Sequence, residues 1–260
     1  MKDREAPLLE ARGVSHYYGA RLGCRDVSFS LWPGEVLAIV GESGSGKTTL
    51  LNCLATSLSP TVGTVAYRMR DGVSRDLTSL SKAERRFLMR TDWGFVHQNP
   101  ADGLRMTVSA GANVGERLMA IGERHYGDIR QSAIGWLERV EVPADRADDD
   151  PRGFSGGMRQ RLQIARNLVT APRLVFMDEP TGGLDVSVQA RLLDLIRALV
   201  ADLGMAAIVV THDLAVARLL SHRMMVMKGG VVVEEGLTDR VLDDPQAPYT
   251  QLLVSSILQV

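Results

Sequence analysis

Apolar and polar positions divide the chain into strand-rich parts at both ends and a more helical part in the middle. Residues 36–40, 174–177 and 206–210 are continuous apolar runs, as expected for strands that are covered on both faces. Between the last two runs, apolar residues recur from Val188 to Leu203 at the spacing of a helix. This alternation of strands and amphipathic helices predicts an α/β core.

The first third of the chain adds strand-like runs at residues 8–11, 27–31 and 62–67, with turns between them. The middle is richer in helical pattern, because apolar positions recur at helix-like intervals over residues 114–121 and 129–140. The chain shows no internal repeat and no low-complexity tract. The pattern therefore predicts an α/β core that is interrupted by a mostly helical insertion.

The octet at residues 41–48, Gly-Glu-Ser-Gly-Ser-Gly-Lys-Thr, matches the phosphate-binding loop pattern at every fixed position. It follows an apolar run and precedes a helical stretch at 49–54, and this context argues against a chance Gly/Ser turn. Glycines let backbone N–H groups converge on phosphate oxygens, and the helix N-terminus favours an anion. Lys47 can reach the β- and γ-phosphates, and Thr48 can ligate Mg²⁺. The octet therefore predicts a site for a nucleoside triphosphate and Mg²⁺.

Composition narrows the class of protein. The 260 residues, of which 45% are hydrophobic and 23% charged, are enough to bury a large core and are ordinary for a globular protein. The 30 basic and 31 acidic residues give no support to a broad nucleic-acid-binding surface. The polar residues 1–5, and the lack of an apolar stretch of about 18 residues, predict no direct membrane insertion. Cys24 and Cys53 lack metal-ligand spacing and fit reduced thiols in a cytoplasmic protein.

Two acidic residues end the apolar run 174–177. Asp178 can hold Mg²⁺, directly or through water. Successive strand side chains point to opposite sides, so Glu179 faces elsewhere and can orient and deprotonate the attacking water. Two solvated acids at a strand end are the alternative, and the phosphate-loop octet argues against it.

His212 lies at the end of the next apolar run, 206–210. A polar side chain there can reach the edge of the sheet where ligands bind in open α/β folds. The functional interpretation is a contact to the γ-phosphate. The alternative is a loop histidine before a helix that Asp213 caps.

Residues 154–161, Phe-Ser-Gly-Gly-Met-Arg-Gln-Arg, resemble the LSGGQ signature of ATP-binding-cassette (ABC) ATPases. Six motif elements follow one another as in that family: the phosphate loop, Gln98, Ser155-Gly156-Gly157, Asp178-Glu179, Gly183-Leu184-Asp185 and His212. Together they cover nearly the whole chain, which makes the resemblance specific. Phe154 and Met158 depart from the signature, at positions that need not supply the phosphate contact.

The resemblance implies one ABC ATPase domain over residues 1–260, with a phosphate-loop core, an N-terminal antiparallel β subdomain and a helical insertion. The core would comprise residues 1–97 and 170–260, and the helical subdomain about 98–169. The resemblance also implies a dimer that holds two ATP molecules head to tail between its subunits. Ser155 and Gly157 of one subunit would then face the γ-phosphate that Lys47 of the other subunit holds.

Further roles come from matching the family's motifs residue by residue. Tyr18 resembles the aromatic residue that stacks on adenine, with Tyr17 as the alternative. Gln98 resembles the Mg²⁺-sensing glutamine, and Asp185 resembles the residue that links the two composite sites, although either Asp185 or Ser155 could cap a helix. The residues expected to bind ATP are Tyr18, Gly41, Glu42, Ser43, Gly44, Ser45, Gly46, Lys47, Thr48, Thr49, Gln98, Ser155, Gly156, Gly157 and Asp185. Those expected in catalysis are Glu179, His212 and Lys47, and those expected to hold Mg²⁺ are Thr48, Gln98 and Asp178.

Within the ABC ATPases, the chain closely resembles the ATP-binding subunits of the bacterial carbon–phosphorus lyase system over residues 90–105, 115–119, 124–130 and 176–194. That resemblance implies an ATPase that docks on a soluble lyase core and couples ATP turnover to phosphonate breakdown. Residues 244–250 instead resemble oligopeptide-type importers, so the ATPase of an oligopeptide or phosphonate importer is the alternative. The chain has no cysteine cluster for iron–sulfur chemistry, so we do not expect it to cleave C–P bonds itself.

The helical insertion is the expected partner-binding part. Its stretch from Arg117 to Arg130 is rich in charge and includes Arg124. A docking surface for a soluble protein and a solvated helix face are both open interpretations of this stretch. A nucleotide-binding scaffold with negligible turnover is a third class of function, and it would leave Glu179 without a role.

Overall fold

The computed structural model describes residues 6–257. They form two compact units, one made of the residues up to Arg85 and from Ala206 onward, and the other of residues 86–205. The division falls within helix α2 (Lys82–Thr91). The insertion expected over about 98–169 lies inside the second unit, and its limits stay a prediction. The polar segment 1–5 lies outside the described residues.

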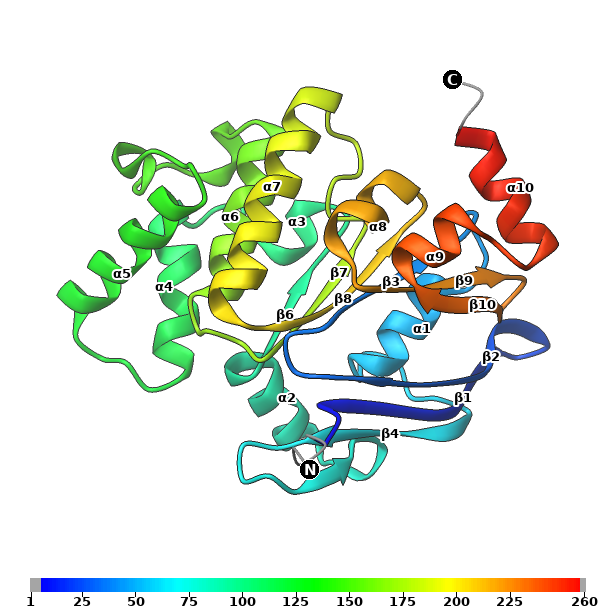
Figure 1. The fold of residues 1–260 in the computed structure, drawn as a ribbon. Helices are drawn as coiled ribbons and strands as arrows, with labels where there is room; N and C mark the ends of the chain where they lie inside the picture. The colour runs from blue at the N-terminus through cyan, green and yellow to red at the C-terminus, as the bar shows by residue number, and fades with distance from the viewer. Residues whose placement is uncertain (1–5, 258–260) are drawn as a thin grey trace, which may run out of the picture. The chain divides into compact units, whose positions relative to one another are not determined.

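The first unit contains a four-stranded antiparallel sheet in the order β2-β1-β4-β5 (Figure 1). Hydrophobic pairs such as Val14 and Val27 face each other across β1 and β2. The turn between these strands passes through Gly19, whose φ of 62° favours glycine. The strands are β1 (Leu9–Tyr18), β2 (Arg21–Leu31), β4 (Val62–Arg68) and β5 (Ser74–Asp76), followed by the short helix η1 (Leu77–Ser79).

The same unit contains a set of strands in the order β10-β9-β3-β8. β3 pairs in parallel with both β8 and β9, whereas β10 returns antiparallel to β9. Every residue of β3 and β8 is buried, which is why both appear as unbroken apolar runs in the sequence. The bounds are β3 (Val36–Val40), β8 (Ala206–Thr211), β9 (Arg223–Lys228) and β10 (Val231–Leu237).

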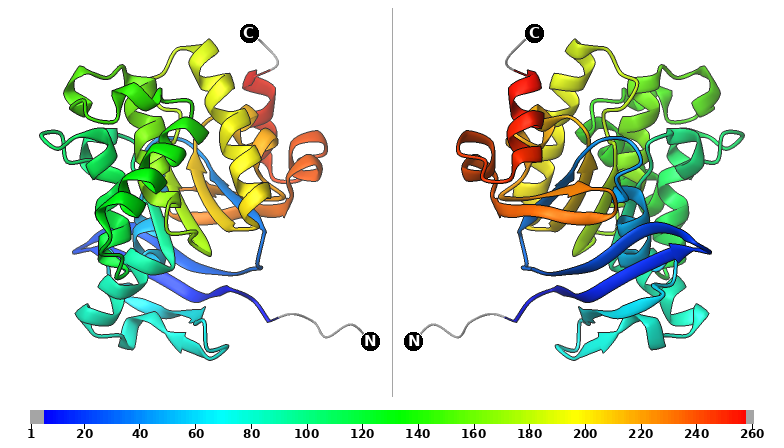
Figure 2. Two further views of the ribbon diagram at one scale, coloured as in Figure 1. Left: turned by 90° about the vertical axis from the view of Figure 1, so that its left-hand side faces the viewer. Right: turned by 90° about the vertical axis from the view of Figure 1, so that its right-hand side faces the viewer.

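Helices cover both faces of these strands. α1 (Lys47–Leu54) contacts β8 on one side and β1 and β2 on the other. The opposite face of these strands is covered by α8 (Leu214–Leu220), α9 (Thr238–Asp243) and α10 (Pro248–Ile257). On that face, Val40, Leu214 and Leu242 share one apolar cluster. In Figure 2 the antiparallel sheet and the C-terminal helices lie on opposite sides of β9 and β10.

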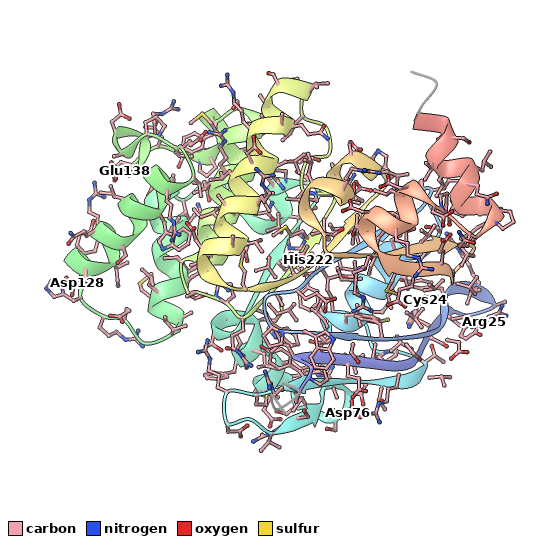
Figure 3. The ribbon with its side chains drawn as sticks, in the orientation of Figure 1. Cys24, Arg25, Asp76, Asp128, Glu138 and His222 are labelled. Carbon is pink, nitrogen blue, oxygen red and sulfur yellow. The ribbon has the colours of Figure 1, made fainter. Side chains whose placement is uncertain are left out.

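Two side chains labelled in Figure 3 are fixed inside this unit. The His222 ring accepts a hydrogen bond from the Val36 amide at 3.0 Å, which fixes the start of β3 beside that of β9. Cys24 on β2 and Cys53 on α1 are both buried and unoxidised. A hydrogen bond with the neighbouring Cys24 thiol, together with burial, raises the pKa of the Cys53 thiol, so this thiol stays protonated at neutral pH.

The second unit packs helices around two parallel strands, β6 (Trp93–Val96) and β7 (Leu174–Asp178). The Trp93 and Phe176 rings from these strands meet edge to face at 5.5 Å. Helix α6 contacts β6 and also the helices α3, α4, α5 and α7. The helices are α3 (Pro100–Gly103), α4 (Ala110–Ala120), α5 (Tyr126–Arg139), η2 (Ala144–Arg146), η3 (Pro151–Gly153), α6 (Gly156–Leu168) and α7 (Val186–Leu203).

The predicted fold class is confirmed: the chain is α/β, with an antiparallel sheet in addition to its parallel strands. The apolar runs at 36–40, 174–177 and 206–210 are strands, and the periodic stretch from Val188 to Leu203 is helical. Across residues 6–257, every helix falls short of the length and apolarity that crossing a bilayer requires.

Candidate active site

The octet at residues 41–48 forms a tight loop between β3 and α1. Lys47 begins α1, and its side chain turns back into the loop, where its Nζ donates to the carbonyl oxygens of Gly41 at 2.7 Å and Glu42 at 2.8 Å. Only 6% of this lysine is exposed. The lysine therefore joins the end of the loop to its beginning and holds an ammonium group there.

Glycine is required at two positions of the loop. Gly41 and Gly46 have φ angles of 147° and 101°, which side chains rarely tolerate. A Cβ at Gly41 would collide with the carbonyl oxygen of Met227, and one at Gly46 with that of Gly23. The loop backbone thus lies directly against β9 and β2.

The N-terminus of α1 is open to a ligand. Gly46 occupies the N-cap position and has no side chain to accept the first N–H groups of the helix. The Ser45 hydroxyl is also buried, and it lacks a hydrogen-bond partner among the described residues. The N–H groups of a helix N-terminus, beside a buried ammonium group, are a good fit for phosphate oxygens.

Tyr18 lies beside this loop. Its hydroxyl is 3.4 Å from the Thr49 hydroxyl on α1, and its ring meets His16 edge to face at 4.6 Å. Tyr18 is 50% exposed, so part of its ring is accessible to a planar ligand. Tyr17, the alternative, uses its backbone N–H to bind the Thr61 hydroxyl.

His212 follows β8 at the same edge of the sheet as the loop. Val40, the last residue of β3, pairs with Thr211, so the two strands end side by side. His212 is exposed there, while Asp213 caps α8 by accepting from the Ala215 N–H at 2.8 Å. The structure therefore brings together His212, Tyr18 and the octet within the first unit.

In the second unit, Gln98 and Glu179 lie at neighbouring strand ends. Val96 pairs with Met177 in the parallel pair β6 and β7, so the two strands end side by side. A Cβ on Gly182 would be 3.6 Å from the Gln98 Cγ, which places Gln98 against the turn after β7. Glu179 itself has a φ of 46°, a strained value for a residue other than glycine.

Buried amide side chains on α6 hold the strand that leads to Gln98. The Gln163 side chain accepts from the His97 N–H at 2.6 Å and donates to the His97 carbonyl at 3.1 Å. The Asn167 side chain makes the same pair of bonds with Phe95, at 3.0 and 2.9 Å. β6 has β7 on one side only, so these amides satisfy the backbone along its other edge.

The Ser-Gly-Gly segment begins α6 and lies against the start of α7. Ser155 caps α6 by accepting from the Met158 N–H at 3.2 Å. A Cβ on Gly157 would be 2.7 Å from the Val188 Cγ1, so the contact requires glycine. Asp185 caps α7, and the N–H of Val188 lowers the pKa of its carboxyl group.

Two arginines of the charged stretch from Arg117 to Arg130 already have partners within the second unit. Arg117 donates to the carbonyl oxygens of Met89 at 2.6 Å and Trp93 at 2.7 Å, and burial lowers its pKa to about 10. Arg130 forms two hydrogen bonds of 2.8 Å with Asp148. Arg117 is therefore a structural residue, and Arg130 has its charge balanced within the unit.

Sequence reasoning missed three groups that hold the octet in place. Met227 and Gly230 lie behind it, and the Tyr249 hydroxyl accepts from the Glu42 N–H at 3.2 Å. The resemblance of residues 244–250 to importer cassettes drew attention to Tyr249 without giving it a role. The consecutive glycines Gly229 and Gly230 are a local sequence signal for a turn there.

A glycine-rich loop that joins a buried strand to a helix and is closed by a buried lysine defines a phosphate-loop nucleotide-binding protein. The family model described as ABC transporter matches residues 24–182. PhnK of Escherichia coli (strain K12), whose name describes a phosphonates utilization ATP-binding protein, is 66% identical over 97% of this chain and 98% of its own length. The dipeptide transport ATP-binding protein DppF of Haemophilus influenzae is 35% identical over 96% of this chain and 78% of its own length.

Solved structures agree with these matches. The dimer of the ATP-binding cassette MJ0796, in a post-hydrolysis state bound to ADP and Pi, has a TM-score of 0.79 and 29% identity, covering 88% of this chain and 98% of that one. The chain therefore belongs to the ABC transporter family of ATP-binding proteins and is related to PhnK. It is an ATPase that binds ATP, and the dimeric cassettes support pairing with a second ABC subunit.

Proposed function

We propose that the chain is the ATP-hydrolysing subunit of a carbon–phosphorus lyase system, docking on the lyase core and coupling ATP turnover to phosphonate breakdown. The observation that carries this proposal is the 66% identity to PhnK over almost the whole of both chains. The dipeptide transport ATP-binding protein DppF is far less similar, at 35%. We also propose that the protein works in the cytoplasm, where ATP and a soluble lyase core would both be present.

The first unit would supply the groups that bind the phosphates of ATP. The N–H groups at the start of α1 and the Lys47 ammonium would hold the β- and γ-phosphates, and Tyr18 would stack on the base. The His212 imidazole would contact the γ-phosphate. Support comes from the shape of the loop, since its glycines leave room where a Cβ would collide with neighbouring backbone.

The second unit would supply the hydrolytic groups. Asp178 and Gln98 carry oxygen ligands, which is the ligand type that Mg²⁺ prefers. The Thr48 hydroxyl, which belongs to the first unit, is a further oxygen ligand. When bound, Mg²⁺ neutralises charge on the phosphate oxygens. Glu179 would accept the proton of the attacking water. Its strained backbone conformation is of a kind that clusters at active sites.

The Ser-Gly-Gly surface would close on the nucleotide of a second subunit. Ser155 and Gly156 are exposed at the start of α6, where the helix N-terminus attracts an anion. The neighbouring Val186 is an apolar side chain that is 84% exposed. An exposed apolar residue beside a ready anion site is consistent with an interface that forms around ATP.

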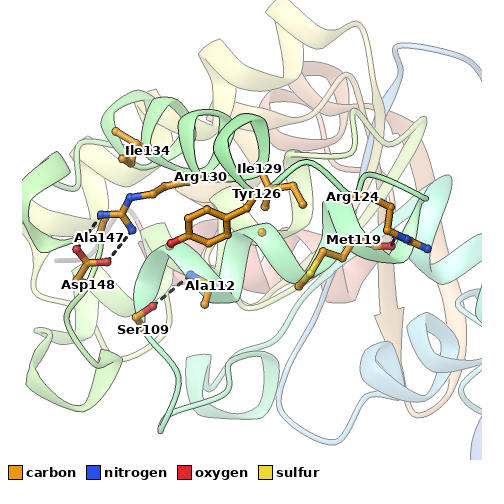
Figure 4. A pocket seen from close by; sticks show the side chains of 12 residues that line it. Ser109, Ala112, Met119, Arg124, Tyr126, Ile129, Arg130, Ile134, Ala147 and Asp148 are labelled. Carbon is orange, nitrogen blue, oxygen red and sulfur yellow. Dashed lines mark hydrogen bonds and ion pairs between the residues drawn. The ribbon is translucent and has the colours of Figure 1, made fainter.

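The docking surface that we propose is a pocket of about 240 Å³ between α4 and α5 (Figure 4). Its walls are mainly apolar and include Met119, Ile129 and Tyr126, whose side chain is 73% exposed. Figure 4 shows Tyr126 across the pocket, with Arg130 and Asp148 on one side and Arg124 on the other. Such a pocket fits one bulky apolar side chain of a partner.

The charge of Arg124 indicates that the partner carries an acidic group. Arg124 donates to the carbonyl oxygens of Met119 at 2.7 Å and Glu123 at 2.8 Å, and none of the carboxylates in residues 6–257 lies within ion-pair distance of it. Arg130 is balanced by Asp148. The occupant that fits is a segment of the lyase core with a carboxylate next to an apolar anchor, because the carboxylate would pair with Arg124.

Binding of the purified lyase core to surface variants tests this docking proposal. We expect Arg124→Glu and Tyr126→Ser each to weaken binding by roughly tenfold or more, and basal ATP turnover to stay unchanged. Arg86→Glu, at an exposed position on α2, is the matched control. Unchanged affinity of both pocket variants would show that the lyase core does not dock on this pocket.

An importer ATPase is the second candidate. It is favoured by the match to DppF over 96% of this chain and by the importer-like residues 244–250. Affinity purification from cells growing on a phosphonate separates the two candidates. Lyase subunits in the purified complex would support the first candidate, and a transmembrane permease in their place would support the second.

A further inference from the structure

Residues in the C-terminal part of the first unit form hydrogen bonds with the backbone of the phosphate loop. The Gly230 N–H, in the turn between β9 and β10, donates to the Ser45 carbonyl at 3.0 Å. The Glu42 N–H donates to the Tyr249 hydroxyl at 3.2 Å. Glu42 and Tyr249 are 207 residues apart in sequence, so this contact exists only in the folded chain.

Tyr249 is built into the core at the first turn of α10. Its side chain is 7% exposed and belongs to the apolar cluster that contains Val40, the residue before the loop. The Lys228 Nζ lies 4.5 Å from the centre of its ring. The tyrosine thus contacts the strand that enters the loop, the hairpin behind the loop and the loop itself.

The start of α10 is fixed by a carboxylate on β10. Glu234 accepts hydrogen bonds from the N–H groups of Gln246 at 2.8 Å and Ala247 at 2.9 Å, immediately before the helix. Burial raises the pKa of Tyr249, so its hydroxyl stays neutral at physiological pH. Position and protonation of the hydroxyl are therefore both set by the surrounding protein.

We propose that Tyr249 is a positioning residue for the phosphate loop, and that its hydroxyl fixes the Glu42 peptide in the conformation that receives the triphosphate. A loop that is already ordered loses less conformational entropy when its ligand binds. The C-terminal helix thereby becomes part of the nucleotide site without touching the nucleotide. This inference rests on the proposed assignment of the octet to triphosphate binding.

Tyr249→Phe tests the inference, because it keeps the ring and removes only the hydroxyl. In the nucleotide-free protein, we expect the Glu42 amide to exchange its hydrogen faster than in the wild type. Loss of one neutral hydrogen bond to the loop should raise the KM for MgATP by about two- to tenfold, with a smaller change in kcat. A purely structural role for the ring would leave both the exchange rate and the KM unchanged.

Leu252→Ala is the matched control, since it alters an exposed position of the same helix. Equal melting temperatures of the three proteins would show that the fold is intact. Unchanged Glu42 exchange and unchanged KM in Tyr249→Phe would overturn the inference. If the wild type itself did not bind MgATP, the assignment of the octet would fail, whereas the exchange measurement would still decide the role of Tyr249.

Discussion

Gln163 offers a test of how the signature helix holds the strand before Gln98. Its side chain makes three hydrogen bonds, two with the His97 backbone and one with the Gln160 side chain at 3.2 Å. Gln163 is fully buried. Gln163→Leu keeps a similar volume and removes all three bonds. Each bond contributes on the order of 1 kcal/mol, so we expect a loss of about 2–4 kcal/mol in the free energy of unfolding.

Urea denaturation followed by circular dichroism measures this loss. Gln131→Leu, at an exposed position on α5, is the control and should change the free energy of unfolding by no more than about 0.5 kcal/mol. We also expect the ATPase rate of Gln163→Leu to fall, since His97 directly precedes Gln98. A loss below about 1 kcal/mol would refute the view that these amides fix the edge of β6.

Three further variants test separate parts of the structure. Gly46→Ala should weaken MgATP binding by roughly tenfold or more, measured by calorimetry, because its φ of 101° and the Gly23 carbonyl exclude a Cβ. Arg117→Leu should lower the free energy of unfolding by about 2–4 kcal/mol, while Arg86→Leu should have little effect. Arg130 lowers the pKa of Asp148, so this carboxylate stabilises the fold above its usual pKa of 3.8 and ceases to as pH falls through its lowered value. In Asp148→Asn, the melting temperature should therefore fall less steeply than in the wild type as the pH is lowered below about 4.

The octet and its flanking elements were predictable because their signal is local. Gly41, Gly46 and Lys47 are each required by the geometry of a single turn, and the apolar run before them reports the burial of β3. The same holds for Ser155 and Asp185, which cap the helices that follow them. In both cases a few consecutive residues determine the local structure.

Contacts between distant residues were not predictable in this way. Nothing near Tyr249 in the sequence indicates that its hydroxyl meets Glu42. Arg117 belongs to a charged stretch, and only the packing of α4 shows that it satisfies carbonyl groups of other elements. Gln163 looks like any polar residue of an amphipathic helix until β6 is placed beside it.

The general-base role of Glu179 carries the proposed ATPase mechanism, and one measurement tests it most directly. Purified Glu179→Gln is mixed with MgATP, and the bound nucleotide, the mass of the complex and phosphate release are measured together. We expect retained ATP, a stable dimer of cassettes and phosphate release that is at least a hundredfold slower than in the wild type. Phosphate release at the wild-type rate would contradict it.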